Sequence, residues 1–298
     1  LGDGTTTQRL SPILVPGMTS GVTKMATVDI STYQHVCAIK DGGVWCWGYG
    51  GYGQLGNSAS ASSNSPVQVT GLTSGAPDVA VVQSDGYYAN SSCAVVSGSV
   101  KCWGYDGYGQ LGNDAALTTL NAPVQVSGLT SGVTEVISGG GHHFCAIHSG
   151  SAKSWGCNGY GNLGNGTTTN APTPVQVTGL TSGVTKLEPS YSITDGYGYG
   201  CAIKDGGLWC WGYNGYGNLG DGTTTQRLSP VQVSGLTSGV TDFDLDGGLY
   251  GQGCALTSTG AMKCWGYSGY GSIGDGLNVQ QNTPFQVVGL TSGVTAIL

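Results

Sequence analysis

The chain is poor in charge, and its few charges are mostly negative. Only 8% of its 298 residues are charged, with nine Lys and Arg against sixteen Asp and Glu, and the formal net charge is −7. Binding to nucleic acid requires a basic face that neutralises phosphates, and nine basic residues spread over this length do not supply one. We therefore expect no nucleic-acid partner, and we interpret the acidic balance as a contribution to solubility.

Long apolar runs are also absent. No stretch approaches the roughly 18 consecutive apolar residues that indicate a membrane-spanning helix, so we expect no membrane insertion. Long soluble helices are disfavoured too, because 56 residues are glycine and each costs roughly 1 kcal/mol relative to alanine inside a helix. Hydrophobic residues still make up 39% of the chain, enough for a core. An all-β fold with many tight turns fits this composition.

The dominant feature of the sequence is a repeat of about 54 residues. Each unit has a Trp-Gly pair, a Gly-Tyr-Gly segment followed by Leu-Gly or Ile-Gly, a short apolar segment after a proline, and a Gly-rich turn. The Trp-Gly pairs begin at Trp47, Trp103, Trp155, Trp211 and Trp265. About four short β segments fit in one unit, and strands this short cannot bury a face alone. The period predicts a β-propeller with one four-stranded antiparallel blade per unit; a β-solenoid, the rival, usually has shorter coils.

The motifs of one unit have a known counterpart. The unit contains Cys-Ala-Ile at 37–39, Val-Trp-Cys-Trp-Gly-Tyr at 44–49, Gly-Tyr-Gly-Gln-Leu-Gly-Asn at 51–57 and Pro-Val-Gln-Val at 66–69. This pattern resembles the regulator of chromosome condensation (RCC1) repeat, and the resemblance extends over essentially the whole chain. It implies a propeller of four-stranded blades around a central channel. The cysteine-rich, weakly charged form of the repeat is similar to the secreted bacterial members of the family, but the fold alone does not select a function.

The two ends of the chain hold parts of a sixth unit. Leu1–Met25 aligns with Ile273–Leu298, so we predict five complete repeats plus a split or incomplete sixth blade within a single propeller domain, residues 1–298. An outer strand is predicted around Ile13–Val15 and an inner strand around Val294–Leu298, without the hairpin between them. We expect either a fragment of a longer chain or a blade that another molecule completes, because unpaired strand edges bind other chains.

Eight of the ten cysteines form pairs that flank predicted hairpin turns. Across a two-residue Asp41-Gly42 turn, Cys37 lies opposite Cys46 in a non-hydrogen-bonded pair, where the Cα atoms are about 4.5 Å apart and a disulfide fits. The same register gives Cys93–Cys102 and Cys201–Cys210, and a three-residue loop with a left-handed Gly260 gives Cys254–Cys264. Four disulfides indicate an oxidising compartment, so we expect an extracellular or cell-surface location. Reduced core cysteines are the alternative.

The third unit departs from this rule. Cys145 faces Ser154, and the spare Cys157 follows three residues later. A Cys145–Cys157 bond would require a distorted strand, and free thiols or intermolecular bonds are the alternatives. A zinc site is not expected, because the chain has no C-x-x-C motif.

Candidates for catalysis or cofactor binding are few. No nucleophile, base and orienting acid form a recognisable arrangement, so we predict no enzyme and no cofactor. Gly48–Gly53 matches G-x-G-x-x-G, but no helix is predicted after it, and we interpret it as a turn. The four histidines are interpreted as structural: His35, His142, His143 and His148.

One acidic segment resembles the start of a calcium loop. Asp242, Asp244 and Asp246 alternate with apolar residues, but the twelfth position is Gly253 instead of the glutamate that such a loop requires. Calcium is therefore a weak candidate ligand of these three residues. The alternative is a strand with Phe243 and Leu245 on one face and solvated carboxylates on the other.

The strongest candidates for a binding role are tyrosines in the Gly-rich loops after the Trp-Gly pairs. Tyrosine combines a large contact area with a polar tip, and repeat symmetry places these loops at one position around the ring. The alternative is that the rings pack between blades. The tyrosines are Tyr49, Tyr52, Tyr105, Tyr108, Tyr160, Tyr213, Tyr216, Tyr267 and Tyr270.

These features favour a non-enzymatic extracellular or cell-surface interaction module that binds a protein or a glycan through its propeller loops. The alternative function is a self-assembling structural subunit of an extracellular filament or surface layer, whose partners are copies of itself.

Overall fold

The computed structural model describes residues 1–27, 33–82, 90–115, 117–191, 197–246 and 250–297. Within these ranges the chain forms twenty strands in five four-stranded antiparallel sheets, and no helix. Accordingly, no helix among the described residues is long and apolar enough to cross a membrane. The predicted all-β fold with four-stranded blades is confirmed.

Each sheet is one blade, and its strands follow one another in chain order. Blade 1 contains β1 (Val22–Thr27), β2 (His35–Lys40), β3 (Gly43–Gly48) and β4 (Ser63–Gln68). Blade 2 contains β5 (Asp78–Val82), β6 (Ser91–Val96), β7 (Ser99–Gly104) and β8 (Leu120–Gln125). Blade 3 contains β9 (Val133–Ser138), β10 (His143–His148), β11 (Ser151–Gly156) and β12 (Ala171–Gln176). Blade 4 contains β13 (Val184–Tyr191), β14 (Gly198–Lys204), β15 (Gly207–Gly212) and β16 (Arg227–Gln232). Blade 5 contains β17 (Val240–Asp246), β18 (Gln252–Thr257), β19 (Met262–Gly266) and β20 (Gln281–Gln286).

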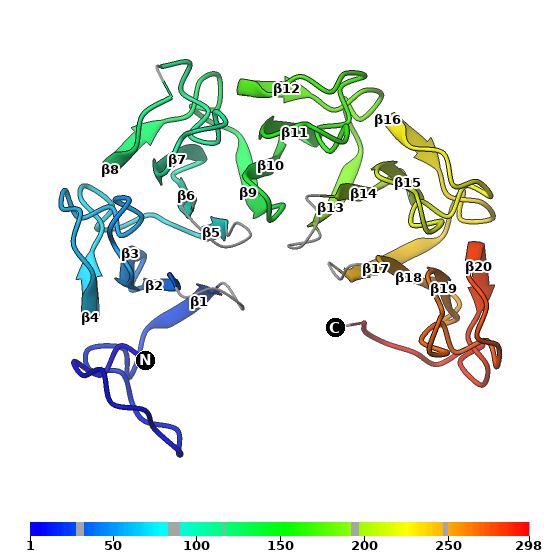
Figure 1. Cartoon of the computed structure of the whole chain (residues 1–298), viewed down its shortest axis with the longest axis horizontal. Coiled ribbons are helices and arrows are strands. Elements are labelled where there is room, and N and C mark those ends of the chain that lie inside the picture. Colours follow the sequence, from blue (N-terminus) through cyan, green and yellow to red (C-terminus); the bar gives the residue numbers. More distant parts are fainter. Residues whose placement is uncertain (28–32, 83–89, 116, 192–196, 247–249, 298) are drawn as a thin grey trace.

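The five blades stand side by side along an arc (Figure 1). The first strand of each blade lies on the inside of the arc and the fourth on the outside (Figure 1). The first strands of adjacent blades contact one another, from β1 and β5 to β13 and β17. The arc is open between the N-terminal segment and blade 5 (Figure 1).

The hairpin turn between the second and third strands sets the register of each blade. Asp41 and Gly42 have φ angles of 51° and 76°, and two consecutive positive φ values characterise the type I′ turn that suits a two-residue hairpin. Cys37 consequently pairs with Cys46 across β2 and β3, and their Cα atoms lie 4.1 Å apart. The structure contains the four predicted disulfides, Cys37–Cys46, Cys93–Cys102, Cys201–Cys210 and Cys254–Cys264.

The prediction of a Cys145–Cys157 bond is wrong. Both cysteines are free. Cys145 pairs with Ser154 in the ladder between β10 and β11, and Cys157 lies three residues beyond Ser154. At about 3.4 Å per residue, that spacing separates the two cysteines by roughly 10 Å along the strand.

A buried tryptophan joins each blade from the second onward to the blade before it. The indole Nε1 of Trp103 in blade 2 donates a hydrogen bond of 2.8 Å to the carbonyl of Gln54 in blade 1. Trp155, Trp211 and Trp265 make the same bond to the preceding blade. Glycine is required beneath the ring, because a Cβ on Gly56 would lie 2.7 Å from Nε1 of Trp103. The Trp-Gly and Leu-Gly motifs of the repeat are thus the two sides of one contact between blades.

The strands predicted for a sixth blade are not formed in the described part of the chain. Ile13–Val15 and residues 294–297 adopt no strand conformation, and Leu298 lies outside the described residues. A first and a fourth strand cannot pair without the two strands between them. Residues 1–4 instead pack on blade 1, where the N–H of Gly4 donates to the carbonyl of Asn64 at 2.9 Å.

Candidate functional site

Two sets of loops meet at one end of every blade. Because the strands of a blade are antiparallel, the loop after the first strand and the loop after the third strand leave the sheet at the same end. Tyrosines from both loops gather there and contact one another through their rings. We call this set the tyrosine belt. It comprises Tyr33, Tyr49, Tyr52, Tyr105, Tyr108, Tyr160, Tyr197, Tyr213, Tyr216, Tyr250 and Tyr267.

Ring contacts between belt tyrosines cross three of the four blade boundaries. The ring of Tyr52 in blade 1 lies 6.1 Å from that of Tyr105 in blade 2, edge to face. Tyr160 and Tyr213 repeat this contact between blades 3 and 4 at 6.3 Å, and Tyr216 and Tyr267 repeat it between blades 4 and 5 at 5.7 Å. Edge-to-face pairs at such distances each contribute about 0.5–1.5 kcal/mol beyond the area they bury. The rings therefore hold one another in place.

Three members of the belt were missed by the sequence analysis. Tyr197 stacks on Tyr213 with ring centroids 4.2 Å apart, and Tyr250 stacks on Tyr267 at the same distance. Tyr33 contacts Tyr49 at 4.6 Å. All three lie one or two residues before the second strand of their blade, and this shared position is the signal that could have found them.

Blade 3 interrupts the tyrosine pattern. Cys157 follows the Trp155-Gly156 pair, where the other four blades have a tyrosine. His142 stacks instead on Tyr108 of the preceding blade, with ring centroids 4.6 Å apart and an interplanar angle of 22°. Aromatic contact therefore extends from blade 2 into blade 3 through a histidine.

Some side chains of the belt are packed against their neighbours, and others are exposed at the surface. Most of its tyrosines are half-buried, while Tyr108 and Tyr250 are 39% and 36% exposed. Tyr270, the ninth tyrosine predicted from the sequence, is 90% exposed and makes no ring contact with any described residue. Both sequence-based interpretations thus describe part of the arrangement, and the binding role stays a prediction.

The acidic segment of blade 5 forms strand β17. Phe243 and Leu245 are buried while Asp242, Asp244 and Asp246 are not, as the alternation predicts. Asp242 accepts a hydrogen bond of 2.6 Å from Lys186 Nζ. The described residues include no group of three or more His, Cys, Asp or Glu side chains that could hold a metal ion. Calcium at this strand stays a prediction without geometric support.

A row of charged residues on the inner strands was not foreseen. Lys24, Asp78, Glu135, Lys186 and Asp242 occupy the same position in their repeats. Lys24 pairs with Asp78 between blades 1 and 2, and Lys186 pairs with Asp242 between blades 4 and 5. Asp78 also accepts a 2.8 Å hydrogen bond from the Val136 N–H of blade 3. Burial raises the pKa of Glu135. The row joins adjacent blades at the inner rim.

The buried histidines have structural surroundings. Nε2 of His35 in blade 1 lies 2.8 Å from Oγ of Ser92 in blade 2, and burial lowers the pKa of His35 to about 3. His143 is also fully buried, which lowers its pKa to about 4. Both imidazoles are therefore neutral at physiological pH.

Sequence similarity to known proteins extends over most of the chain. Ultraviolet-B receptor UVR8 of Arabidopsis thaliana is 28% identical over 257 residues, which are 85% of this chain and 56% of that protein. E3 ubiquitin-protein ligase HERC2 of Homo sapiens is 30% identical over 231 residues, 76% of this chain but 5% of that protein. The chain thus spans about half of UVR8 and a small part of HERC2. The chain also matches the crystal structure of human WBSCR16 with 23% identity and a TM-score of 0.65, over 85% of this chain and 65% of the WBSCR16 chain. This similarity shows the fold and nothing about the function.

The family model of the regulator of chromosome condensation (RCC1) repeat matches residues 41–84, 97–147, 149–195 and 205–244. These four matches coincide with successive blade-length stretches of the arc and span more than half of the sequence. The chain therefore belongs to the regulator of chromosome condensation (RCC1) repeat family.

Proposed function

We propose that this chain is a non-enzymatic interaction module that binds a protein partner through the tyrosine belt, with a glycan as the second ligand class. The observation that carries the proposal is the gathering of tyrosines at one end of the blades, with ring contacts that cross from blade to blade. Large, amphipathic side chains of this kind are enriched at protein interfaces.

The packing of the belt favours affinity. Tyrosines that already stack on one another, such as Tyr250 on Tyr267 at 4.2 Å, have few rotamers left to lose when a partner binds. Ordering a free side chain costs about 0.5–1.5 kcal/mol at an interface, so a prepacked ring retains most of its contact energy. Phenol rings carry no charge at neutral pH, and binding should accordingly depend little on salt.

The activities of the full-length relatives are not assigned to this chain. HERC2 is named as an E3 ubiquitin-protein ligase, but this chain corresponds to only 5% of its length. We therefore propose a recognition role and no ligase chemistry.

We also propose that the protein acts outside the cell or at its surface. Four blades carry a disulfide, and disulfides persist in oxidising compartments. The intact mass of protein purified from its source, measured after alkylation without reduction, tests this proposal. Eight oxidised cysteines are expected, and ten alkylated cysteines would refute an oxidising location.

Affinity capture with matched variants tests the binding proposal. Tyr108→Ala and Tyr250→Ala each remove a belt ring that is partly exposed, while Phe285→Ala removes a similarly exposed ring, 43%, from the outermost strand β20. Each protein is immobilised and exposed to extracellular material from its source. We expect one ligand to be retained by the wild type and by Phe285→Ala and lost from both belt variants. Equal retention by all four proteins would refute the belt as the binding surface, and digestion with protease or glycosidase identifies the ligand class.

A further inference from the structure

In blade 4, a buried asparagine amide holds the loop that follows the third strand. The Nδ2 group of Asn214 donates to four oxygen atoms of that loop: Asp221 Oδ1 at 3.2 Å, the Thr223 carbonyl at 3.1 Å, Thr223 Oγ1 at 3.4 Å and the Thr225 carbonyl at 3.0 Å. Asn158 makes the same four bonds in blade 3. All these partners lie in the same blade as the asparagine, so the arrangement does not depend on a neighbouring blade.

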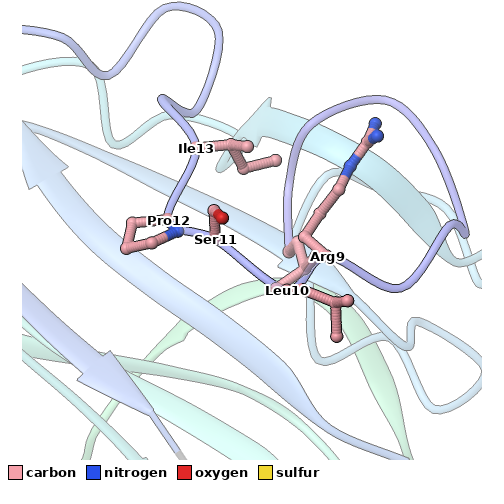
Figure 2. Close-up of a pocket in the computed structure, with 6 residues that line it drawn as sticks. Arg9, Leu10, Ser11, Pro12 and Ile13 are labelled. Carbon is pink, nitrogen blue, oxygen red and sulfur yellow. The ribbon is translucent and has the colours of Figure 1, made fainter.

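The carboxylate in this loop of blade 4 also has a counter-charge. The side chain of Asp221 is only 2% exposed, and its Oδ2 accepts a hydrogen bond of 2.8 Å from Arg227 Nε. The N-terminal segment contains the same pair, where Arg9 Nε donates to Asp3 at 2.9 Å, and Figure 2 shows Arg9 reaching into the turn of its own segment. A buried carboxylate at this position is thus neutralised by a guanidinium group.

Blade 5 keeps the backbone of this loop. Residues 268–284 correspond one to one with residues 214–230. The N–H of Leu277 donates to Asp275 Oδ1 at 2.9 Å, as the N–H of Thr223 donates to Asp221 Oδ1 at 3.0 Å. The carbonyl oxygens that surround the Asn214 amide in blade 4 therefore have counterparts in blade 5.

Two substitutions remove the groups that satisfy these oxygens in blade 4. Ser268 replaces Asn214, and Gln281 replaces Arg227. Serine lacks the amide, so the space and the acceptors of the Nδ2 group are left to another group. Ser268 Oγ is fully buried and has no hydrogen-bond partner among the residues that the structure describes. Gln281 Nε2 still donates to Asp275 Oδ2 at 2.7 Å, but it carries no charge.

The oxygens at this position have the chemistry of a calcium site. They are one carboxylate oxygen of Asp275, the Ser268 hydroxyl, and the carbonyls of Leu277 and Val279. Asp275 is 8% exposed, and in the described ranges no Lys or Arg pairs with it, although a buried charge is costly without a partner. Calcium binds carboxylate, carbonyl and water oxygens, and water reaches this loop because Leu277 and Val279 are 52% and 59% exposed.

We propose that Asp275, Ser268 and the carbonyls of Leu277 and Val279 bind a calcium ion, which holds the loop of blade 5 as the Asn214 amide holds that of blade 4. The ion supplies the missing positive charge, and water completes its coordination. Because the site contains one carboxylate, the dissociation constant should be about 10⁻⁴–10⁻³ M, the range of extracellular calcium modules. Magnesium should bind less well, because it loses its water reluctantly.

Thermal unfolding of chelator-treated protein tests the proposal. Calcium at about 10 mM, roughly tenfold above the weaker limit of the dissociation constant, should raise the melting temperature of the wild type by about 2–5 °C at constant ionic strength. The double variant Ser268→Asn with Gln281→Arg restores both blade 4 residues, so it should fold and show no such rise. Asp244→Asn removes a carboxylate from strand β17 and should respond like the wild type.

Three results would overturn the proposal. They are a wild type that does not respond to calcium, a double variant that responds as the wild type does, and a response that Asp244→Asn abolishes, which would place the ion at β17. The proposal does not involve the tyrosine belt, so Tyr108→Ala should keep the calcium response even if it loses its ligand.

A crystal structure grown with calcium distinguishes the ion from a water molecule at the same position. Calcium should lie about 2.3–2.6 Å from its oxygen ligands, whereas hydrogen-bonded water lies about 2.7–3.2 Å away, and water alone would overturn the proposal. The reverse exchange in blade 4, Asn214→Ser with Arg227→Gln, leaves Asp221 in place and should create a second site. Equilibrium dialysis should then find more calcium bound at saturation than in the wild type, and an unchanged amount would count against the proposal.

Discussion

Blade 3 lacks the disulfide that the other four blades carry, and one substitution should restore it. Cys145 in β10 pairs with Ser154 in β11, in the register that joins Cys37 to Cys46 in blade 1. The substitution Ser154→Cys therefore places two sulfur atoms on directly opposed residues. Burial raises the pKa of the Cys145 thiol to about 12, and thiol–disulfide exchange requires a thiolate, so the bond should form during oxidative folding and not afterwards.

The expected gain is modest because the closed loop is short. In the chain-entropy treatment a loop of about ten residues contributes about 2.7 kcal/mol at 25 °C. The substitution also removes the buried hydrogen bond from Ser154 Oγ to the Leu163 carbonyl, which is 2.7 Å long, at a cost of about 1 kcal/mol. The net stabilisation is therefore about 1–2 kcal/mol, equivalent to a rise in melting temperature of roughly 2–3 °C for a chain of this size.

Urea unfolding and thiol counting measure this effect. The wild type has two free cysteines, Cys145 and Cys157, and the oxidised Ser154→Cys variant should have one. Ser154→Ala is the control, because it loses the hydrogen bond without gaining a sulfur, and it should be less stable than the wild type by about 1 kcal/mol. Three alkylated thiols in Ser154→Cys, or a stability no higher than that of Ser154→Ala, would refute the register on which the blade description depends.

Two further predictions concern the blade boundaries. Burial holds the pKa of His35 at about 3, against 6.5 for the free side chain, so the unfolded state binds the proton first and the free energy of unfolding falls as the pH drops below 6.5. Between pH 7 and pH 5, urea unfolding should show a decrease for His35→Asn that is about 2 kcal/mol smaller than for the wild type. Equal decreases for the two proteins would show that His35 is not buried. Trp211→Ala should lower the free energy of unfolding by about 3–5 kcal/mol, because Trp211 is fully buried between blades. Trp45→Ala should have a smaller effect, because Trp45 is half-buried. Similar losses of stability for both variants would contradict the role of the Trp-Gly motif in joining adjacent blades.

The fold could be predicted from the sequence because each blade repeats its own local rules. A two-residue turn with positive φ at Asp41 and Gly42 fixes the register of its hairpin, and that register alone places Cys37 opposite Cys46. Both the turn and the pairing lie within ten residues of sequence.

Contacts between blades were harder to predict, because they join residues about one repeat apart. Lys24 and Asp78 pair across a blade boundary, and only the packing of β1 on β5 brings them together. The belt residues Tyr197 and Tyr250 share a repeat position with Tyr33 before the second strand of their blades, but this position lies outside the motifs on which the prediction was based. The strand expected around Ile13–Val15 was an error of the same kind, since strand formation depends on a neighbouring strand that the repeat alone does not guarantee.

The affinity of the captured ligand for four proteins tests the central claim most directly. Calorimetric titration of the wild type, Tyr108→Ala, Tyr250→Ala and Phe285→Ala, each at low and high salt, compares belt rings with a ring of similar exposure elsewhere. If the tyrosine belt is the binding surface, each belt variant should bind at least about tenfold more weakly, with Phe285→Ala unchanged and little effect of salt. Equal affinities for all four proteins, or binding that weakens steeply with salt, would contradict a tyrosine-mediated interface.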